Sequence, residues 1–223
     1  MECDVKSKPR WSRRKEARPA ELLAAALDLF VERGYAATRL DDVAALAGVS
    51  KGTLYLYFAN KEELFKAVVR ENLVPVLEEA EETLAAYTGP SVQLLREFLF
   101  GWWKRVGTSQ LSGLVKLIMA ESGNFPEVAR FYHEEVISRA SAFIVGMLER
   151  GIAHGEFRPV DPLQAQQVIV APMLMLMMWK HSYNACQLTP IAPEPYLECL
   201  FDLLANGLLT GKMPADAARE SPC

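Results

Sequence analysis

TRLDDVAALAGVSKGTLYLYFANKEELF, residues 38–65, predicts two short helices followed by the start of a longer one. Thr38 is the candidate cap of the first helix, whose apolar residues recur at helical spacing: Leu40, Val43, Ala44 and Ala47. Gly48 is expected to end that helix. Ser50 is a typical N-cap whose side-chain oxygen can accept the amide hydrogen of Thr53, so the second helix is expected to begin there.

The second of these helices has an unusual outward face. At about 100° per residue, Leu54 and Phe58 lie on its inward side, which leaves tyrosine and leucine side chains on the opposite side. Two helices of about two turns, joined by a glycine-containing turn, are typical of a helix-turn-helix, whose second helix enters the major groove of DNA. The alternative is a plain helical hairpin inside a larger bundle.

The residue types on this outward face suit contact with nucleic acid. Lys51 can reach a phosphate or a guanine edge, Thr53 offers a hydroxyl and a methyl group, and Gly52 lets the backbone approach closely. Asn60 is a further N-cap and opens the longer helix. Lys61, in the first turn of that helix, is placed to meet the DNA backbone.

The segment AGVSKGTLYLYFANKEELF, residues 47–65, resembles the DNA-binding signature of TetR-type (tetracycline-repressor-like) transcriptional regulators, and residues 24–69 follow the family pattern without a gap. The resemblance implies an all-α homodimeric repressor with a three-helix N-terminal DNA-binding domain and a larger C-terminal domain that binds a small-molecule inducer. Position by position, it implies contacts to bases or phosphates from Thr38, Arg39, Lys51, Gly52, Thr53, Tyr55, Tyr57 and Lys61. Asp41 and Asp42 stand where some relatives carry basic residues.

The net charge of −4 conceals an uneven distribution of charge along the chain. Residues 1–70 hold 13 basic and 10 acidic side chains, a net charge of +3, whereas the remaining 153 residues hold 11 and 18, a net charge of −7. Electrostatic attraction for phosphates is therefore confined to the N-terminal part. An ordinary globular composition, 51% hydrophobic and 23% charged, also predicts a substantial core.

Neither a disulfide framework nor a membrane segment is expected. The four cysteines, at positions 3, 186, 199 and 223, form no Cys-x-x-Cys pair, and residues 1–18 lack the apolar run of a signal peptide. Free thiols in the cytoplasm are therefore expected, without a metal site. The apolar run at residues 168–179 is too short for a bilayer, which needs about 20 residues, so we expect no membrane partner.

The chain is expected to fold as about nine helices in two domains. We predict a basic flexible arm at residues 1–17, a helix-turn-helix DNA-binding domain at 18–70, a ligand-binding and dimerisation domain at 71–211 and a disordered tail at 212–223. The arm either lies along DNA or is merely solvated. The helix from Lys61 is expected to bend at Pro75 and to belong to both domains.

Large aromatic and methionine side chains of the C-terminal part are the candidates for a ligand pocket. Of the adjacent pair Trp102 and Trp103, one is expected in the core and the other in the cavity wall. The candidates are Trp102, Trp103, Met119, Phe125, Phe131, Phe143, Met147, Met173, Met177 and Trp179. Such a wall suits a small apolar or aromatic ligand. Ordinary core and dimer packing is the alternative for the methionines.

No sequence pattern indicates catalysis. Nucleophile-elbow, zinc-protease, Walker A and dinucleotide-binding motifs are missing, and the three histidines lack partners at metal spacing. We therefore expect no enzyme activity, no cofactor and no metal. The leading hypothesis is a ligand-responsive repressor that dimerises through its last two long helices on a palindromic, double-stranded operator. The alternatives are a constitutive or activating DNA-binding regulator without an inducer pocket, and an enzyme that kept a helix-turn-helix.

Overall fold

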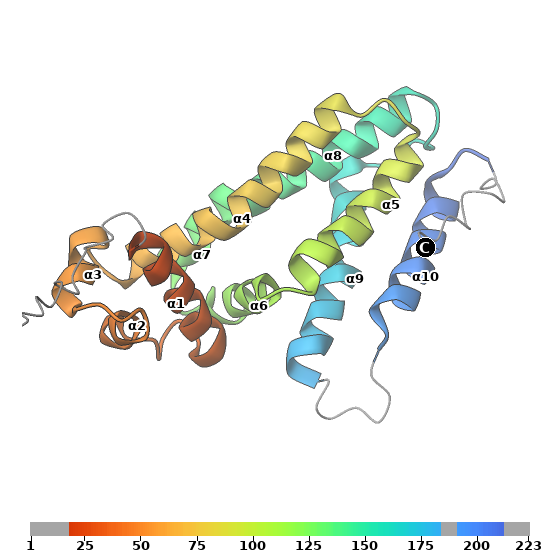
Figure 1. Ribbon diagram of the computed structural model, residues 1–223. Coiled ribbons are helices and arrows are strands. Elements are labelled where there is room, and N and C mark those ends of the chain that lie inside the picture. The colour runs from red at the N-terminus through yellow and green to blue at the C-terminus, as the bar shows by residue number, and fades with distance from the viewer. Residues whose placement is uncertain (1–17, 184–190, 212–223) are drawn as a thin grey trace, which may run out of the picture.

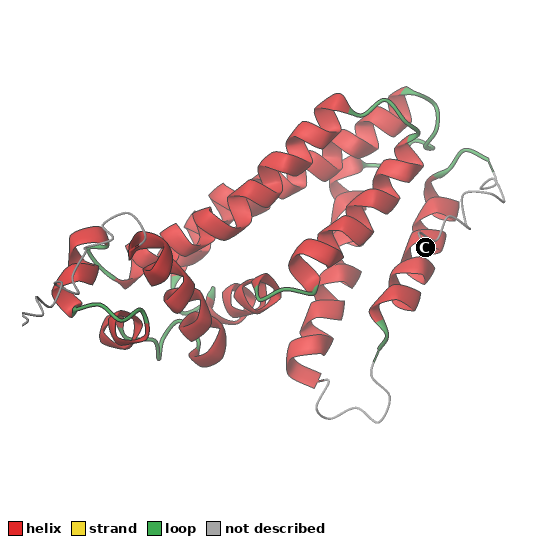
Figure 2. Ribbon diagram, in the orientation of Figure 1, coloured by secondary structure: helices red, strands yellow, loops and turns green. Residues whose placement is uncertain are grey.

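A computed structural model describes residues 18–183 and 191–211, and these residues form helices joined by short loops (Figure 1). The N-terminal helices are α1 (Arg18–Arg33), α2 (Leu40–Leu46), α3 (Lys51–Tyr57) and the long α4 (Lys61–Ala86). Within the described residues no strand forms, and Figure 2 shows only helices and loops apart from the undescribed trace. The all-α prediction is confirmed.

The C-terminal helices are α5 (Ser91–Trp102), α6 (Leu111–Glu121), α7 (Pro126–Tyr132), α8 (Ser138–Ala153), α9 (Pro162–Met178) and α10 (Pro193–Leu208). Three π-helical segments continue them: η1 (Trp103–Gly107), η2 (His133–Ile137) and η3 (Trp179–Tyr183). Because η2 joins α7 to α8 without a break, the described residues hold nine separate helical rods, as expected. The predicted arm at residues 1–17 and tail at 212–223 lie outside the described residues.

Two of the three predicted caps in the N-terminal domain are confirmed. The Ser50 side chain accepts the amide of Thr53 at the start of α3, and the Asn60 side chain accepts the amide of Glu63 at the start of α4. The prediction for Thr38 was wrong, because Arg39 occupies the N-cap of α2 and forms no side-chain hydrogen bond there. Gly48 has a φ of 65°, which a side chain would disfavour, and it lies in the turn that ends α2, as expected.

Helix α4 takes part in two hydrophobic cores. Its first half packs with α1, α2, α3, α6 and α7 through residues such as Phe65 and Leu73, whereas Val76, Ala80 and Leu84 contact the core of α5, α8, α9 and α10. The rings of Phe65 and Phe30 meet edge to face with their centroids 5.3 Å apart. Since α4 runs without interruption through Pro75, the two cores are joined by one continuous helix.

Helix α6 lies against α1 through a close backbone approach. A β-carbon at Gly113 would lie 2.5 Å from the Cγ1 atom of Val31, so only glycine allows this spacing. Gln110, just before α6, donates a hydrogen bond of 2.9 Å to the carboxylate of Asp28 on α1. Helices α4 and α6 together therefore fix the position of the N-terminal helices on the C-terminal ones (Figure 1).

Candidate functional site

The outward face of α3 carries large side chains that the protein core leaves uncovered. Leu54 is fully buried and anchors the helix, whereas Tyr55 and Tyr57 are exposed and Leu56 keeps 84% of its surface accessible. Gly52 is also exposed, and a β-carbon there would contact only the Ser50 hydroxyl, at 3.8 Å. The first turn of α3 thus leaves room for a close approach to another molecule.

Lys51, at the N-terminus of α3, forms an ion pair with the helix before it. Its Nζ atom lies 2.8 Å from the Oδ1 atom of Asp41, and both side chains are largely exposed. The hydrogen bond to Asp41 raises the pKa of Lys51, so the ammonium group stays charged. Asp41 therefore competes with any phosphate or base that approaches Lys51.

Asp41→Asn is expected to tighten binding to any DNA duplex by about 2- to 5-fold, because Lys51 loses its competitor and the repulsion between Asp41 and phosphate disappears. The magnitude of the salt slope should rise by about one. Asp42→Asn is the matched control, because Asp42 pairs with Arg33 at 3.2 Å and not with Lys51. Fluorescence anisotropy at several salt concentrations measures both effects, and equal gains in the two variants would contradict the assignment.

The other predicted DNA contacts lie in different environments. Arg39 is exposed at the start of α2. Thr38 keeps only 2% of its surface accessible, and its hydroxyl lies 2.7 Å from the carbonyl oxygen of Gly34. Its side chain is therefore held inside the protein, and a DNA contact at this position stays a prediction. Lys61 donates hydrogen bonds of 2.8 and 3.1 Å to the carbonyl oxygens of Tyr35 and Ala36. Burial lowers the pKa of Lys61, whose ammonium group ties α4 to the loop after α1.

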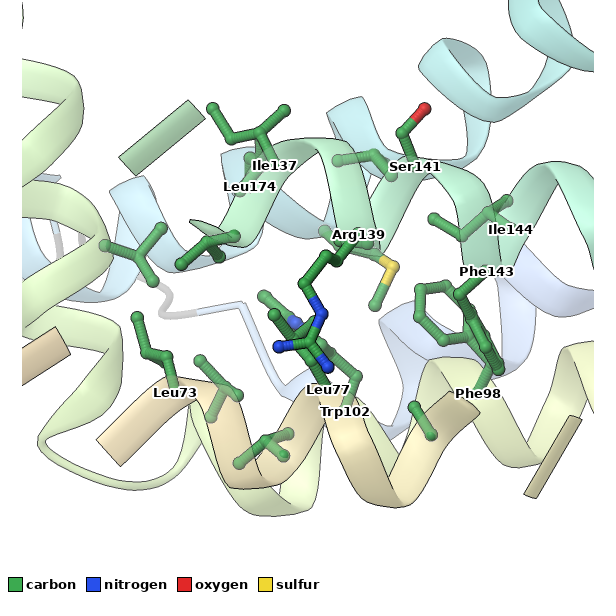
Figure 3. A pocket seen from close by; sticks show the side chains of 18 of the residues that line it. Leu73, Leu77, Phe98, Trp102, Ile137, Arg139, Ser141, Phe143, Ile144 and Leu174 are labelled. Carbon is green, nitrogen blue, oxygen red and sulfur yellow. The ribbon is translucent and has the colours of Figure 1, made fainter. Parts of the chain in front are cut away.

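A cavity of about 590 Å³ lies in the C-terminal half, between α4, α5, α6, α8 and α9 (Figure 3). Its size is within the range of small-molecule sites, about 300–1,000 Å³. Most of its wall is apolar, and Figure 3 shows Leu73 and Leu77 of α4 across the space from Ile137 and Leu174. One wall is therefore made by the helix that also supports the N-terminal domain.

Four of the ten predicted pocket residues line this cavity: Trp102, Met119, Phe143 and Met173. The other six do not line this cavity: Trp103, Phe125, Phe131, Met147, Met177 and Trp179. Adjacent residues of a helix point in different directions, which is why Trp102 faces the cavity and Trp103 is buried in the core.

Two of the excluded aromatic residues belong to the core on the N-terminal side. Phe125 packs against the Tyr35 ring with a centroid distance of 4.7 Å. The Phe131 ring lies under the Arg70 guanidinium group at 4.9 Å. Met147 and Met177 are buried in the second core and are not among the residues that line the cavity.

Polar residues of the cavity wall were missed by the sequence interpretation. Arg139 on α8 donates hydrogen bonds of 2.8 and 2.7 Å to the carboxylate of Glu81, and Arg105 pairs with Glu79. Both carboxylates lie in an acidic run of α4 that, from sequence, resembles an ordinary solvated face. The arginines are 26 or more residues away along the chain, so no local pattern reveals the pairs.

Exposed apolar residues also gather on α9 and α10. Val168 and Leu203 keep 62% and 66% of their surfaces accessible, and Met175 keeps 50%. On α9, exposed positions recur at helical spacing: Gln164, Val168, Ala171 and Met175. These are the last two long helices, for which the sequence interpretation expects contact with a second copy of the chain.

The described residues were also compared with what a metal site and a membrane-spanning helix require. Within residues 18–183 and 191–211, no group of three histidine, cysteine, aspartate or glutamate side chains is arranged to hold a metal ion. In the same part of the chain, no helix is both long and apolar enough to cross a membrane.

Family models match most of the described chain. A model for bacterial regulatory proteins of the tetR family matches residues 22–68, and a model for the C-terminal domain of AefR-like transcriptional repressors matches residues 93–190. The uncharacterised HTH-type transcriptional regulator YhgD of Bacillus subtilis (strain 168) is 30% identical over 190 residues, which cover 83% of this chain and 96% of that protein.

Similar folds are found among solved structures. The transcriptional regulator FadR from Bacillus subtilis, in complex with stearoyl-CoA, has a TM-score of 0.71 at 23% identity over 84% of this chain and 98% of that one. A putative transcriptional regulator from Saccharomonospora viridis, in complex with choline, has a TM-score of 0.73 at 18% identity over 89% and 100%. At these identities the likeness shows the shared fold.

Proposed function

The chain belongs to the TetR family of bacterial regulatory proteins, and from this premise we propose that it is a ligand-responsive transcriptional repressor. In this proposal a homodimer binds a palindromic operator through two copies of α3 and is released by a small apolar or aromatic inducer. The observation that carries the proposal is the position of α4. This helix forms a wall of the 590 Å³ cavity and also packs in the core that supports α3.

A ligand acts in this arrangement by favouring one of two packings. DNA binding requires a fixed separation of the two α3 helices, which for adjacent major grooves is about 34 Å. A ligand that fills the cavity better in another packing of α4 and α6 shifts the population away from the DNA-binding state. The factor by which a ligand shifts the equilibrium between the two packings cannot exceed the ratio of its affinities for them.

The relatives differ in what they bind. One similar structure holds stearoyl-CoA and another holds choline, so the family fold accommodates ligands of different charge and size. The preference for an apolar or aromatic inducer therefore rests on this cavity, whose wall includes Phe98, Trp102 and Phe143.

The test is binding of the purified protein to DNA upstream of its own gene, first against salt and then against a panel of neutral and charged aromatic compounds. We expect sequence-selective binding that at least one compound weakens by about 5- to 150-fold. Binding that no compound changes would favour a constitutive or activating regulator. Equal binding to all DNA sequences would contradict the proposal that the protein has a specific operator.

Thr53→Ala is expected to relax base discrimination at one or two positions of the operator, by about 1–3 kcal/mol at each. Thr53→Ser is the matched control, since it keeps the hydroxyl that lies 2.8 Å from the Ser50 hydroxyl and removes only the methyl group. Selection from a randomised operator library measures the preference at each position. An unchanged preference in Thr53→Ala would remove Thr53 as a base-reading residue.

Tyr55→Phe and Tyr57→Phe test the remaining exposed face. If the two hydroxyl groups contact phosphates, their loss weakens all DNA sequences evenly and leaves the base preference unchanged. The same library selection distinguishes this result from the effect of Thr53→Ala.

A further inference from the structure

Two buried polar side chains of the cavity wall have hydrogen-bonding groups that the protein does not use. Tyr132, at the end of α7, and Gln166, on α9, each keep only 6% of their surface accessible and line the cavity. The Gln166 side-chain oxygen accepts a hydrogen bond of 3.3 Å from Ser141. No partner for the Gln166 Nε2 amide or for the Tyr132 hydroxyl is found among the described residues.

We infer that these unpaired groups face the cavity. The Nε1 atom of Trp103 is the single fully enclosed side-chain nitrogen or oxygen without a partner in the described part of the chain. Tyr132 Oη and Gln166 Nε2 also have no partner but are not fully enclosed, so each atom keeps some accessible surface. Both residues lie in the cavity wall. Buried donors are costly to leave unpaired, so water or a ligand is expected to satisfy them.

The charged residues of the wall do not offer an equivalent site for an ion. Arg105 and Arg139 are already paired with Glu79 and Glu81 of α4, so an anion must first separate an existing ion pair. Figure 3 shows Arg139 extending across to α4. Glu97 forms no ion pair among the described residues, but it is exposed, and a solvated carboxylate attracts a cation only weakly.

We propose that the ligand of this cavity is an uncharged, largely apolar molecule whose carbonyl oxygen accepts hydrogen bonds from the Tyr132 hydroxyl, the Gln166 side-chain amide, or both. This assignment rests on the proposed function, because it names the chemical class of ligand for the same cavity. Tyr132 and Gln166 are then the residues that determine specificity. The apolar wall supplies most of the affinity, and the two donors select the oxygen-bearing compound.

Burial supports the role of Tyr132 as a donor. It raises the pKa of Tyr132, so the phenol keeps its proton at neutral pH. Tyr132 also belongs to the core formed by α1 and the first half of α4, together with Leu73 and Phe65. A carbonyl group held by Tyr132 would therefore sit at the end of the cavity nearest the N-terminal domain.

The experiment uses matched pairs of probes that differ only at one oxygen: acetophenone and ethylbenzene, benzophenone and diphenylmethane, and dibenzyl ketone and 1,3-diphenylpropane. Phenylbutyrate and benzyltrimethylammonium provide the anionic and cationic comparisons. Calorimetric titration of the full-length protein gives each dissociation constant. For the pair that fits best, we expect the ketone to bind about 10-fold more tightly than the hydrocarbon.

The variants remove the donors while keeping the side-chain shape. In the double variant Tyr132→Phe with Gln166→Leu, the ratio of ketone to hydrocarbon affinity should fall to about one, and the single variants show which donor is used. Tyr35→Phe is the matched control, because Tyr35 is buried in the same core as Tyr132 but does not line the cavity. Circular dichroism melting curves confirm that each variant is folded.

Several results would overturn the assignment. These are equal binding of ketone and hydrocarbon in the wild type, an unchanged ratio in the double variant, tighter binding of either charged probe, and no binding of any ketone in the series. A ketone that binds as expected but leaves operator affinity unchanged gives a different result. It supports the ligand class and counts against the inducible repressor of the proposed function.

Discussion

Leu203→Glu is expected to convert the proposed dimer into a monomer at micromolar concentration and to weaken operator binding by at least about 100-fold. Leu203 lies on α10 with 66% of its surface accessible, and the helix α9, which contacts α10, carries the exposed stripe that includes Val168. In a symmetric dimer, the substitution buries two carboxylates without partners, which costs several kcal/mol. The operator affinity then falls because the two copies of α3 no longer bind as one unit.

Analytical ultracentrifugation over a range of concentrations measures the dimer dissociation constant, and anisotropy measures the operator affinity. Val168→Glu should have the same effect from the neighbouring helix. Ala85→Glu is the matched control, because Ala85 is an exposed residue on α4, a helix whose main contacts are with α1, α7, α8 and η2 and not with α9 or α10. A Leu203→Glu protein that sediments like the wild type at every concentration would exclude this face as the dimer interface.

Gly113→Ala is expected to weaken operator binding by about 5- to 150-fold without removing the fold. The new methyl carbon would lie 2.5 Å from Val31 Cγ1 and 3.1 Å from Val31 Cγ2, and a valine side chain has little freedom to move aside. Overpacking of this kind costs about 1–3 kcal/mol. We assume that α1 must pack against α6 in the DNA-bound state but can move away from it in the free protein. The strain energy is then present only in the DNA-bound state, so all of it appears as a loss of operator affinity.

A second substitution separates this effect from general damage to α6. Val31→Ala removes both methyl groups that clash, so the double variant Gly113→Ala with Val31→Ala should regain most of the operator affinity. Gly123→Ala is the matched control in the turn just after the same helix, because a methyl group there meets no atom within 4 Å. Failure of Val31→Ala to restore binding would show that the contact between α1 and α6 is not the cause.

The N-terminal part of the fold could be predicted because its signals are local. Ser50 and Asn60 are each followed three residues later by the amide that they cap, and Gly48 provides the positive φ of the turn. Such features need only a few neighbouring residues. Thr38 shows the limit, because its hydroxyl bonds to the carbonyl groups of Leu29 and Gly34 in the tertiary structure and not to the helix that follows.

The cavity could be predicted only in part because its wall is built from distant segments. Trp102, Met119, Phe143 and Met173 come from four helices, and nothing in their spacing distinguishes them from Met147 or Met177, which are equally apolar and lie in the core. Hydrophobic periodicity predicts which side of a helix is buried, but it does not predict whether a cavity lies next to that side.

The missed polar residues have a related explanation. Tyr132 and Gln166 are unremarkable in sequence, and they stand out only because each is buried with one hydrogen-bonding group that has no partner among the described residues. That property depends on what every neighbouring helix provides, so it is visible only after packing is known.

Pro75 gives α4 a mechanical property that follows from its place between the two cores. Proline has no amide hydrogen, so the helix lacks one hydrogen bond at this point and bends there most easily. The 14 residues from Pro75 back to Lys61 form a lever arm of about 21 Å. A rotation of about 5° around Pro75 moves its far end by roughly 2 Å, so two symmetric subunits change the span between their arms by roughly 4 Å. A small bend at Pro75, which leaves both cores packed, is therefore enough to move the two α3 helices out of register with successive major grooves.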